Sequence, residues 1–225
     1  MTKVGYLANC KPTTLTDANG DELAALLMYF IGDDGSWTKC ALQYKPYFYL
    51  LVEDEAIREI VFYLNKEFAN HLDSLDVVEK EDLDLVNHLS GKTQKYLKLS
   101  FRNVTELLKV RADLLPIVKK NKAEKGTQDA YEGWYDQGET VDARPTKYTI
   151  VAKIVDIREY DVSYHTRVMI DNEIRVAFWY EYTLDGPLCV KLTHLKDKLD
   201  KADLRVMAFD IECTKAPLKF PDVQQ

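Results

Sequence analysis

The sequence predicts an α+β fold, in which a mixed sheet packs against two helices. Apolar stretches that resemble strands give way to apolar residues at helical spacing, and this succession occurs twice within residues 1–118. The segments are separated by turn-forming residues, such as those of Gly32 to Gly35, which tolerate the backbone angles of a hairpin. These observations predict one sheet with its helices on a single face.

The first succession begins with strands, expected at residues 4–8, 23–31, 37–42 and 47–52. The period then changes, which predicts an amphipathic helix over roughly residues 54–69. Its apolar face consists of Ala56, Ile57, Ile60, Val61, Leu64 and Phe68.

The second succession has strands at residues 75–78 and 96–101 and a helix over 103–115. Asn103 can cap that helix, and Glu106 three residues later resembles a capping box. Pro116 is expected to end it.

The remaining residues are predicted to form less regular segments. Residues 119–146 contain several lysines and glycines and no sustained apolar period, which indicates a linker or insertion. A second, β-rich part is expected over 147–204. It would contain a short helix near 151–157 and strands at 168–170, 174–182 and 188–192.

Near the end of the sequence, the apolar run Val206 to Phe209 is typical of a strand that is buried on both faces. Such a strand needs neighbours, so we expect the polypeptide to continue. Residues 205–225 are therefore predicted to begin a further domain.

Composition limits the possible functions. No stretch approaches the roughly 20 apolar residues that span a bilayer, and the first residues lack the features of a secretory signal. A membrane partner is therefore not expected. The formal net charge of -7 argues against a protein whose main task is to grip a phosphate backbone, although such a module could border a nucleic-acid path.

Asp210 and Glu212 are the candidate catalytic and metal-binding residues. Positions two apart on a strand project on the same face, and two adjacent carboxylates repel each other unless a cation lies between them. Paired divalent metals held by carboxylates hydrolyse phosphodiesters. The pair alone is not specific, however, because chance gives about six acid-x-acid pairs in a chain of this composition. Six occur, namely 53/55, 79/81, 82/84, 159/161, 171/173 and 210/212.

The surrounding residues make the pair more specific. Residues 205–212, Arg-Val-Met-Ala-Phe-Asp-Ile-Glu, resemble the first exonuclease motif of family B DNA polymerases, and residues 158–167 resemble the segment that precedes it. Stretches at 44–49, 80–89 and 215–222 resemble the epsilon branch of that family. Cys213 departs from this pattern, because epsilon enzymes usually carry Thr there.

The resemblance implies a ferredoxin- or RRM-like α+β part, followed by the first strand of an RNase H-like exonuclease domain. It implies a nuclear protein that replicates DNA and proofreads it with a 3'-5' exonuclease. Mg²⁺ or Mn²⁺ would be held by Asp210 and Glu212, and DNA and other holoenzyme subunits would be partners. The fragment alone is expected to be inactive, with a structural and template-guiding role.

Two alternatives stay open. The chain could be a free-standing module that binds single-stranded nucleic acid, with Tyr47 and Tyr49 stacking on bases. The acidic net charge is instead compatible with a protein-interaction module. A basic cluster on the second helix and the linker could border a template strand, although a solvated helix end is the favoured explanation. Its members are Lys109, Arg111, Lys119, Lys120, Lys122 and Lys125.

Overall fold

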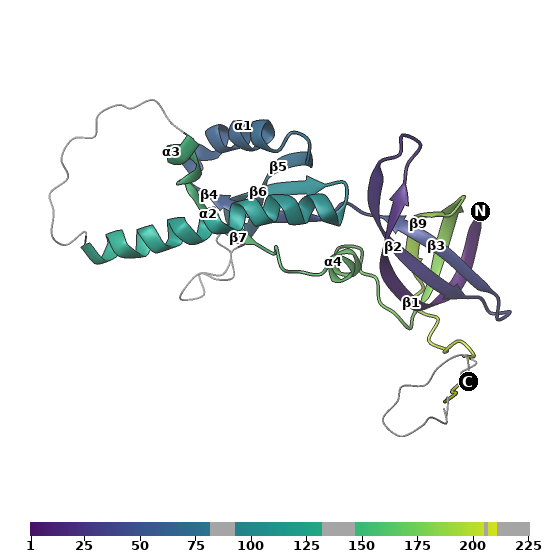
Figure 1. The fold of residues 1–225 in the computed structure, drawn as a ribbon. Helices are drawn as coiled ribbons and strands as arrows, with labels where there is room; N and C mark the ends of the chain where they lie inside the picture. Colours follow the sequence, from purple (N-terminus) through teal and green to yellow (C-terminus); the bar gives the residue numbers. More distant parts are fainter. Residues whose placement is uncertain (82–92, 132–146, 205–206, 211–225) are drawn as a thin grey trace, which may run out of the picture.

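The computed structural model describes residues 1–81, 93–131, 147–204 and 207–210. These residues form a closed barrel and a four-stranded sheet that is covered by helices (Figure 1). The short helix α4 (Tyr164–Asp171) lies between the two units. The combination of sheets with a few helices confirms the predicted α+β class.

The barrel is built from strands that lie far apart in the sequence. They are β1 (Thr2–Thr16), β2 (Glu22–Ile31), β3 (Trp37–Gln43), β8 (Trp179–Asp185) and β9 (Leu188–His194). Their order is β1-β2-β3-β9-β8, and β1 pairs with β8 to close the barrel. Neighbouring strands are antiparallel except β3 and β9, which are parallel where Ala41 lies opposite Leu188.

The inside of the barrel is filled by alternate side chains of these strands. Phe30 of β2 stacks on Tyr182 of β8, with ring centroids 4.2 Å apart. Val168 of α4 and Ile174 are buried in the same cluster, so the segment before β8 contributes to the barrel core. Burial of one such large apolar side chain contributes about 1.5–3 kcal/mol.

The α+β unit contains the remaining elements. These are β4 (Tyr47–Val52), the 3₁₀ turn η1 (Asp54–Ala56), α1 (Ile57–Glu67), β5 (Leu72–Glu81), β6 (Thr93–Phe101), α2 (Val104–Tyr131), α3 (Lys147–Val151) and β7 (Ile154–Arg158). The strand order is β5-β6-β4-β7, and every neighbouring pair is antiparallel. The sheet is thus antiparallel rather than mixed as predicted.

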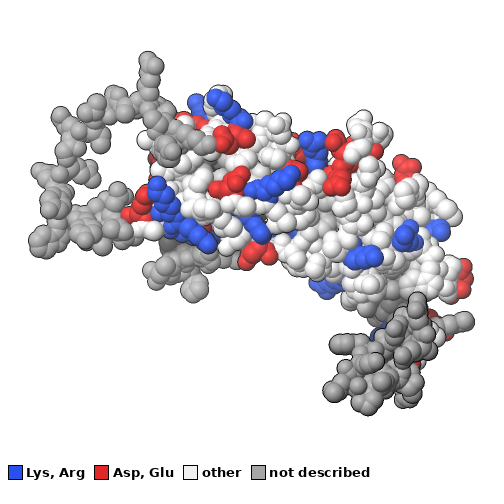
Figure 2. All heavy atoms as spheres, in the orientation of Figure 1, with Lys and Arg blue, Asp and Glu red and all other residues white. Residues whose placement is uncertain are grey.

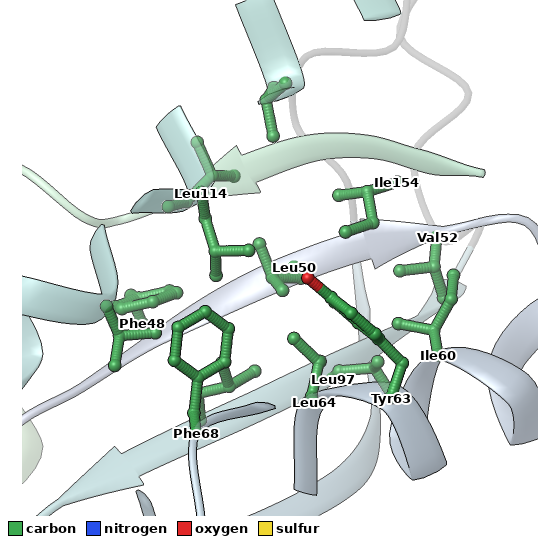
Figure 3. Packing of buried hydrophobic residues seen from close by; sticks show 14 of the residues in the cluster. Phe48, Leu50, Val52, Ile60, Tyr63, Leu64, Phe68, Leu97, Leu114 and Ile154 are labelled. Atoms are coloured by element: carbon green, nitrogen blue, oxygen red, sulfur yellow. The ribbon is translucent and has the colours of Figure 1, made fainter. Parts of the chain in front are cut away.

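Both long helices cover one face of this sheet. Phe48 and Leu50 of β4 point toward α1 and α2, where they pack with Ile60, Leu64 and Leu114 (Figure 3). Side chains of a strand alternate between faces, so the intervening Tyr47 and Tyr49 lie on the opposite face with Tyr96. Both predicted helices begin close to the expected residues.

The helix α2 does not end at Pro116 but continues through it. Its start agrees with the sequence, because the Asn103 side chain accepts a hydrogen bond from the Glu106 backbone N–H at 2.9 Å. Proline removes one hydrogen bond from a helix. Here burial of Leu114 and Val118 on either side of it offsets that loss. Residues 119–131 of the expected linker are therefore helical, and the rest of it lies outside the described residues.

Three other local predictions were wrong. The strand expected over 174–182 begins only at Trp179, because the positive φ of 70° at Ala177 interrupts extended backbone. Residues 168–170 belong to helix α4 rather than to a strand, because Val168 is buried while Ile170 is 63% exposed, so they do not share a face. The helix expected near 151–157 is mostly strand β7. The apolar spacing of residues 151–157 is compatible with a helix or a strand. Residues 154–158 form a strand because they pair with β4.

The units also differ from the predicted division into residues 1–118 and 147–204. Strands β1–β3 close a barrel with β8 and β9 instead of joining the sheet of β4, and β7 joins that sheet. In the described part of the chain, no helix is long and apolar enough to cross a membrane.

Candidate functional site

Of the two predicted metal ligands, Asp210 is the last residue that the structure describes. Asp210 is exposed and follows Met207 and Phe209, which are 80% and 76% exposed. Residues 207–210 take part in none of the strand pairings that the structure describes, so the buried strand expected at 206–209 is not confirmed. A strand exists through hydrogen bonds to a neighbour, and no described strand runs beside this segment. Glu212 and Val206 lie outside the described residues.

The donor chemistry of Asp210 fits a magnesium or manganese ion, because both prefer carboxylate oxygen. The exposed carboxylate can be reached by an ion from solvent. Among the described residues, His, Cys, Asp and Glu side chains nowhere gather in a group of three or more that could hold a metal.

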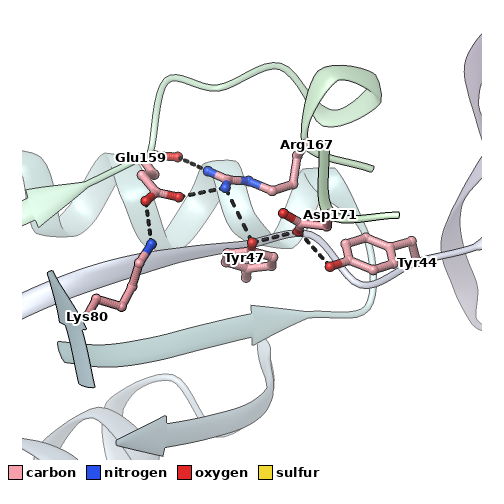
Figure 4. A network of polar contacts seen from close by, with 6 residues as sticks. All are labelled: Tyr44, Tyr47, Lys80, Glu159, Arg167 and Asp171. Carbon is pink, nitrogen blue, oxygen red and sulfur yellow. Dashed lines mark hydrogen bonds and ion pairs between the residues drawn. The ribbon is translucent and has the colours of Figure 1, made fainter. Parts of the chain in front are cut away.

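A polar network joins α4 to the α+β unit (Figure 4). We call it the Arg167 network; its members are Tyr44, Tyr47, Lys80, Glu159, Arg167 and Asp171. It lies at the start of the segment that leads through β8 and β9 to Asp210. Sequence reasoning identified residues 158–167 by resemblance but assigned Arg167 no role.

Arg167 is the centre of this network, and its side chain is only 10% exposed. Its Nη1 lies 2.6 Å from Oε2 of Glu159 and 3.3 Å from the Tyr47 hydroxyl oxygen. Its Nη2 donates to the Glu159 carbonyl oxygen at 3.4 Å. Lys80 reaches the other carboxylate oxygen of Glu159 at 2.5 Å. One carboxylate therefore binds cations from β5 and α4 together.

Asp171, one helical turn after Arg167, links α4 to Tyr44 and Tyr47, which lie just before and at the start of β4. Its Oδ2 accepts hydrogen bonds from the hydroxyls of Tyr44 and Tyr47, both at 2.6 Å. The Tyr164 hydroxyl adds a bond to the Tyr44 carbonyl oxygen at 2.7 Å. Because these bonds come from both ends of α4, they fix its orientation as well as its position.

The network alters the pKa values of Glu159 and Tyr47. Burial would raise the pKa of Glu159, but the hydrogen bond from Lys80 and the charge of Arg167 lower it overall. Burial and the bond to Asp171 raise the pKa of Tyr47 above its usual range. The tyrosines therefore stay protonated, and Glu159 stays ionised. Side chains with these protonation states position α4 against the α+β unit rather than act as a general base.

A prediction follows from the lowered pKa of Glu159. Its charge stabilises the fold above the unfolded pKa of about 4.3, and this contribution is lost as pH falls through the lower folded pKa. We expect Glu159→Gln to be less stable than the unaltered chain at pH 7, with the difference shrinking in acid. Urea unfolding over a pH series measures this. Glu55→Gln, which alters an exposed acid, serves as control. A difference that is constant with pH would contradict the ion-pair role.

Tyr47 and Tyr49 are not available for stacking on bases. Both tyrosines are only 7% exposed. The Lys98 ammonium lies 4.0 Å from the Tyr47 ring centroid, and that of Lys80 lies 4.0 Å from the Tyr49 ring centroid. Cationic side chains thus occupy the ring faces where bases would stack.

The basic cluster on α2 is largely neutralised. Lys109 pairs with Glu106 at 2.9 Å, and the lysines at 120, 122 and 125 pair with Glu124, Asp156 and Glu53. Over the α+β unit, positive and negative side chains alternate closely (Figure 2). A solvated helix surface explains this cluster better than a track for phosphates.

Comparisons with known proteins agree with the motif at the end of the chain. The family described as DNA polymerase family B, exonuclease domain, matches residues 155–225. The chain is 36% identical to a DNA polymerase epsilon catalytic subunit of Dictyostelium discoideum, over 98% of the chain and 11% of that protein. It is 40% identical to an epsilon catalytic subunit of Arabidopsis thaliana, over 99% of the chain and 10% of that protein. The structure of the family B DNA polymerase from Pyrobaculum calidifontis matches 84% of the chain and 20% of that protein, at 14% identity and a TM-score of 0.49.

The chain therefore belongs to the family B DNA polymerases. Within that family, it is similar along nearly its whole length to DNA polymerase epsilon catalytic subunits. It spans about a tenth of the length of these relatives.

Proposed function

We propose that the chain is the amino-terminal part of a replicative DNA-directed DNA polymerase that proofreads with a 3'-5' exonuclease. The observation that carries this proposal is similarity to epsilon catalytic subunits over 98% and 99% of the chain, together with the acidic motif at its end. DNA and further holoenzyme subunits would be its partners, and the nucleus its location.

Asp210 and Glu212 would be the first carboxylates of the exonuclease site, which would begin near residue 205. Divalent ions bound there would supply the Lewis-acid chemistry that activates water for phosphodiester hydrolysis. The two acids would contribute negative charge that retains these ions. The exposed position of Asp210 is compatible with this role.

The folded units would support the site rather than perform chemistry. The Arg167 network would hold α4 against the α+β unit, and α4 also supplies Val168 to the barrel core. The segment that leads to Asp210 would thus start from a fixed position. The succession β4-α1-β5-β6-α2-β7, with strand order β5-β6-β4-β7, supports a ferredoxin-like assignment for the α+β unit.

The chain of 225 residues is expected to show neither polymerase nor nuclease activity, because two-metal hydrolysis needs more ligands than two acids. The measurement is magnesium-dependent degradation of a labelled single-stranded oligonucleotide. Asp210→Ala/Glu212→Ala is the comparison. Nuclease activity that persists in this variant would reveal a different site, and activity that disappears in it would show that two acids suffice.

A further inference from the structure

The outer face of the barrel carries an exposed aromatic and basic surface on β1, β2 and β3. Inward positions of β2, such as Met28 and Phe30, are fully buried, so the intervening Tyr29 points outward. Tyr29 lies opposite Lys39 of β3 and opposite Asn9 of β1. Two positions further along β1, on the same face, Lys11 lies opposite Leu27 of β2.

Trp37 is the most exposed aromatic residue of this surface. It is 65% exposed, and it lies two residues before Lys39 on β3, hence on the same face about 7 Å away. The Lys11 ammonium lies 5.9 Å from the Tyr29 ring centroid. Unlike Tyr47 and Tyr49, Trp37 has an indole ring that is open to solvent.

The charge of this face is opposite to that of the whole protein. Ala25, Ile31 and Ala41 occupy outward positions of these strands but are buried. The outward positions that reach solvent hold Asn9, Lys11, Thr13, Leu27, Tyr29, Trp37, Lys39 and Gln43. Two of them are cationic and none is acidic, whereas the chain carries a formal charge of -7. On the barrel side of the molecule in Figure 2, Lys and Arg side chains lie among uncharged residues, and acidic side chains appear toward the edges.

The nearest acids along the chain are in the turn between β2 and β3. Asp33 forms an ion pair with Lys198 at 2.6 Å. Asp34 accepts a hydrogen bond from the Ser36 backbone N–H at 2.9 Å. Both acids are thus engaged locally, beyond the end of the strand surface.

We propose that this surface, centred on Trp37, Tyr29, Lys11 and Lys39, binds single-stranded nucleic acid. Aromatic rings stack on bases without regard to sequence, and lysines beside them neutralise phosphates. Five-stranded barrels of the OB type bind oligonucleotides on their second and third strands, which here are β2 and β3. This inference does not rest on the exonuclease assignment, because it uses none of those residues.

The test is fluorescence anisotropy of a labelled oligo-dT of about 16 nucleotides, the longest usual site on one such barrel, titrated with the whole chain. Micromolar binding is expected, and the duplex of the same length should bind more weakly, because its bases are already stacked. Trp37→Ala should weaken binding on the order of tenfold, whereas Trp37→Phe should retain most of it. Oligo-U in place of oligo-dT distinguishes an RNA ligand from a DNA ligand.

Salt dependence gives a second, independent readout. Each phosphate contact with a single strand contributes about 0.7 to the slope of log affinity against log salt. Lys11→Gln/Lys39→Gln should therefore reduce that slope by about 1.4. The matched control, Lys66→Gln/Lys119→Gln, removes the same charge from exposed positions on α1 and α2 and should leave the slope nearly unchanged.

These side chains are exposed or half-exposed, so the variants are expected to fold, which circular dichroism checks. Absence of binding by the unaltered chain would overturn the proposal. So would equal affinity of Trp37→Ala and the unaltered chain, or an equal loss in both pairs of lysine variants.

Discussion

Replacing Asp210 and Glu212 by Ala in the full-length protein is expected to lower excision of a mismatched primer end by orders of magnitude. The proposed site loses the carboxylates that retain its metal ions, and with them the activated water and the stabilised leaving oxygen. Extension of a matched primer should be nearly unchanged, because polymerisation uses its own carboxylates. Removing two like charges relieves the repulsion between them, and Asp210 is exposed, so we expect little effect on folding.

The control is Glu53→Ala/Glu55→Ala, another acid-x-acid pair, which lies at the start of the first helical turn. This variant should excise normally. Retained excision in the Asp210 and Glu212 variant would contradict the site assignment. Loss of excision and extension together would indicate that residues 210–212 are needed for folding rather than for metal binding.

Arg167→Ala is expected to have the largest effect on stability. It leaves the Glu159 carboxylate with one cation fewer and removes a donor from the Tyr47 hydroxyl. Breaking a buried ion pair by removing one partner costs about 3–5 kcal/mol. Because the Glu159 side chain is 33% exposed, solvent screens part of this, and we expect roughly 2–3 kcal/mol. In a chain of this size that lowers the melting temperature by about 5–10 °C.

Thermal unfolding of the 225-residue chain measures the effect. Arg167→Lys keeps the charge but loses the two-pronged contact, so it should be intermediate. Arg58→Ala, on the exposed face of α1, is the matched control and should change stability little. In a double-mutant cycle, Arg167→Ala and Glu159→Gln should be strongly non-additive. Equal melting temperatures for Arg167→Ala and Arg58→Ala would show that the network does not hold α4.

Local patterns predicted much of the α+β unit. The helical spacing from Ala56 to Phe68 and the alternation around β4 and β6 identified their elements, because each has one face in the core. The cap at Asn103 was also predictable, since it depends on residues three apart. The length of α2 was not, because burial of Leu114 and Val118 outweighs the effect of the proline between them.

The barrel could not be predicted from local patterns. Its closure pairs Thr2 with Thr183 and Ala41 with Leu188, across most of the chain. Alternation of side chains shows that a strand has a buried face, but not which strand covers it. The α+β unit is inserted between β3 and β8, and no feature of composition marks that insertion.

The assignment of Asp210 and Glu212 stays a prediction. It rests on the spacing of two acids and a family resemblance, and the chance frequency of such pairs shows why spacing alone is insufficient. The Arg167 network was missed because its partners come from four separate segments. Arg167 and Asp171, four residues apart, would have indicated one face of a helix, but the segment was interpreted as a strand.

The most direct test of the central claim is metal binding by the full-length protein. Mn²⁺ is titrated into it, and the free ion is counted by electron paramagnetic resonance. A two-metal exonuclease site predicts that Asp210→Ala/Glu212→Ala binds about two fewer Mn²⁺ ions than the unaltered protein, while Glu53→Ala/Glu55→Ala binds as many. Equal stoichiometry in all three proteins would contradict the assignment of Asp210 and Glu212 as metal ligands.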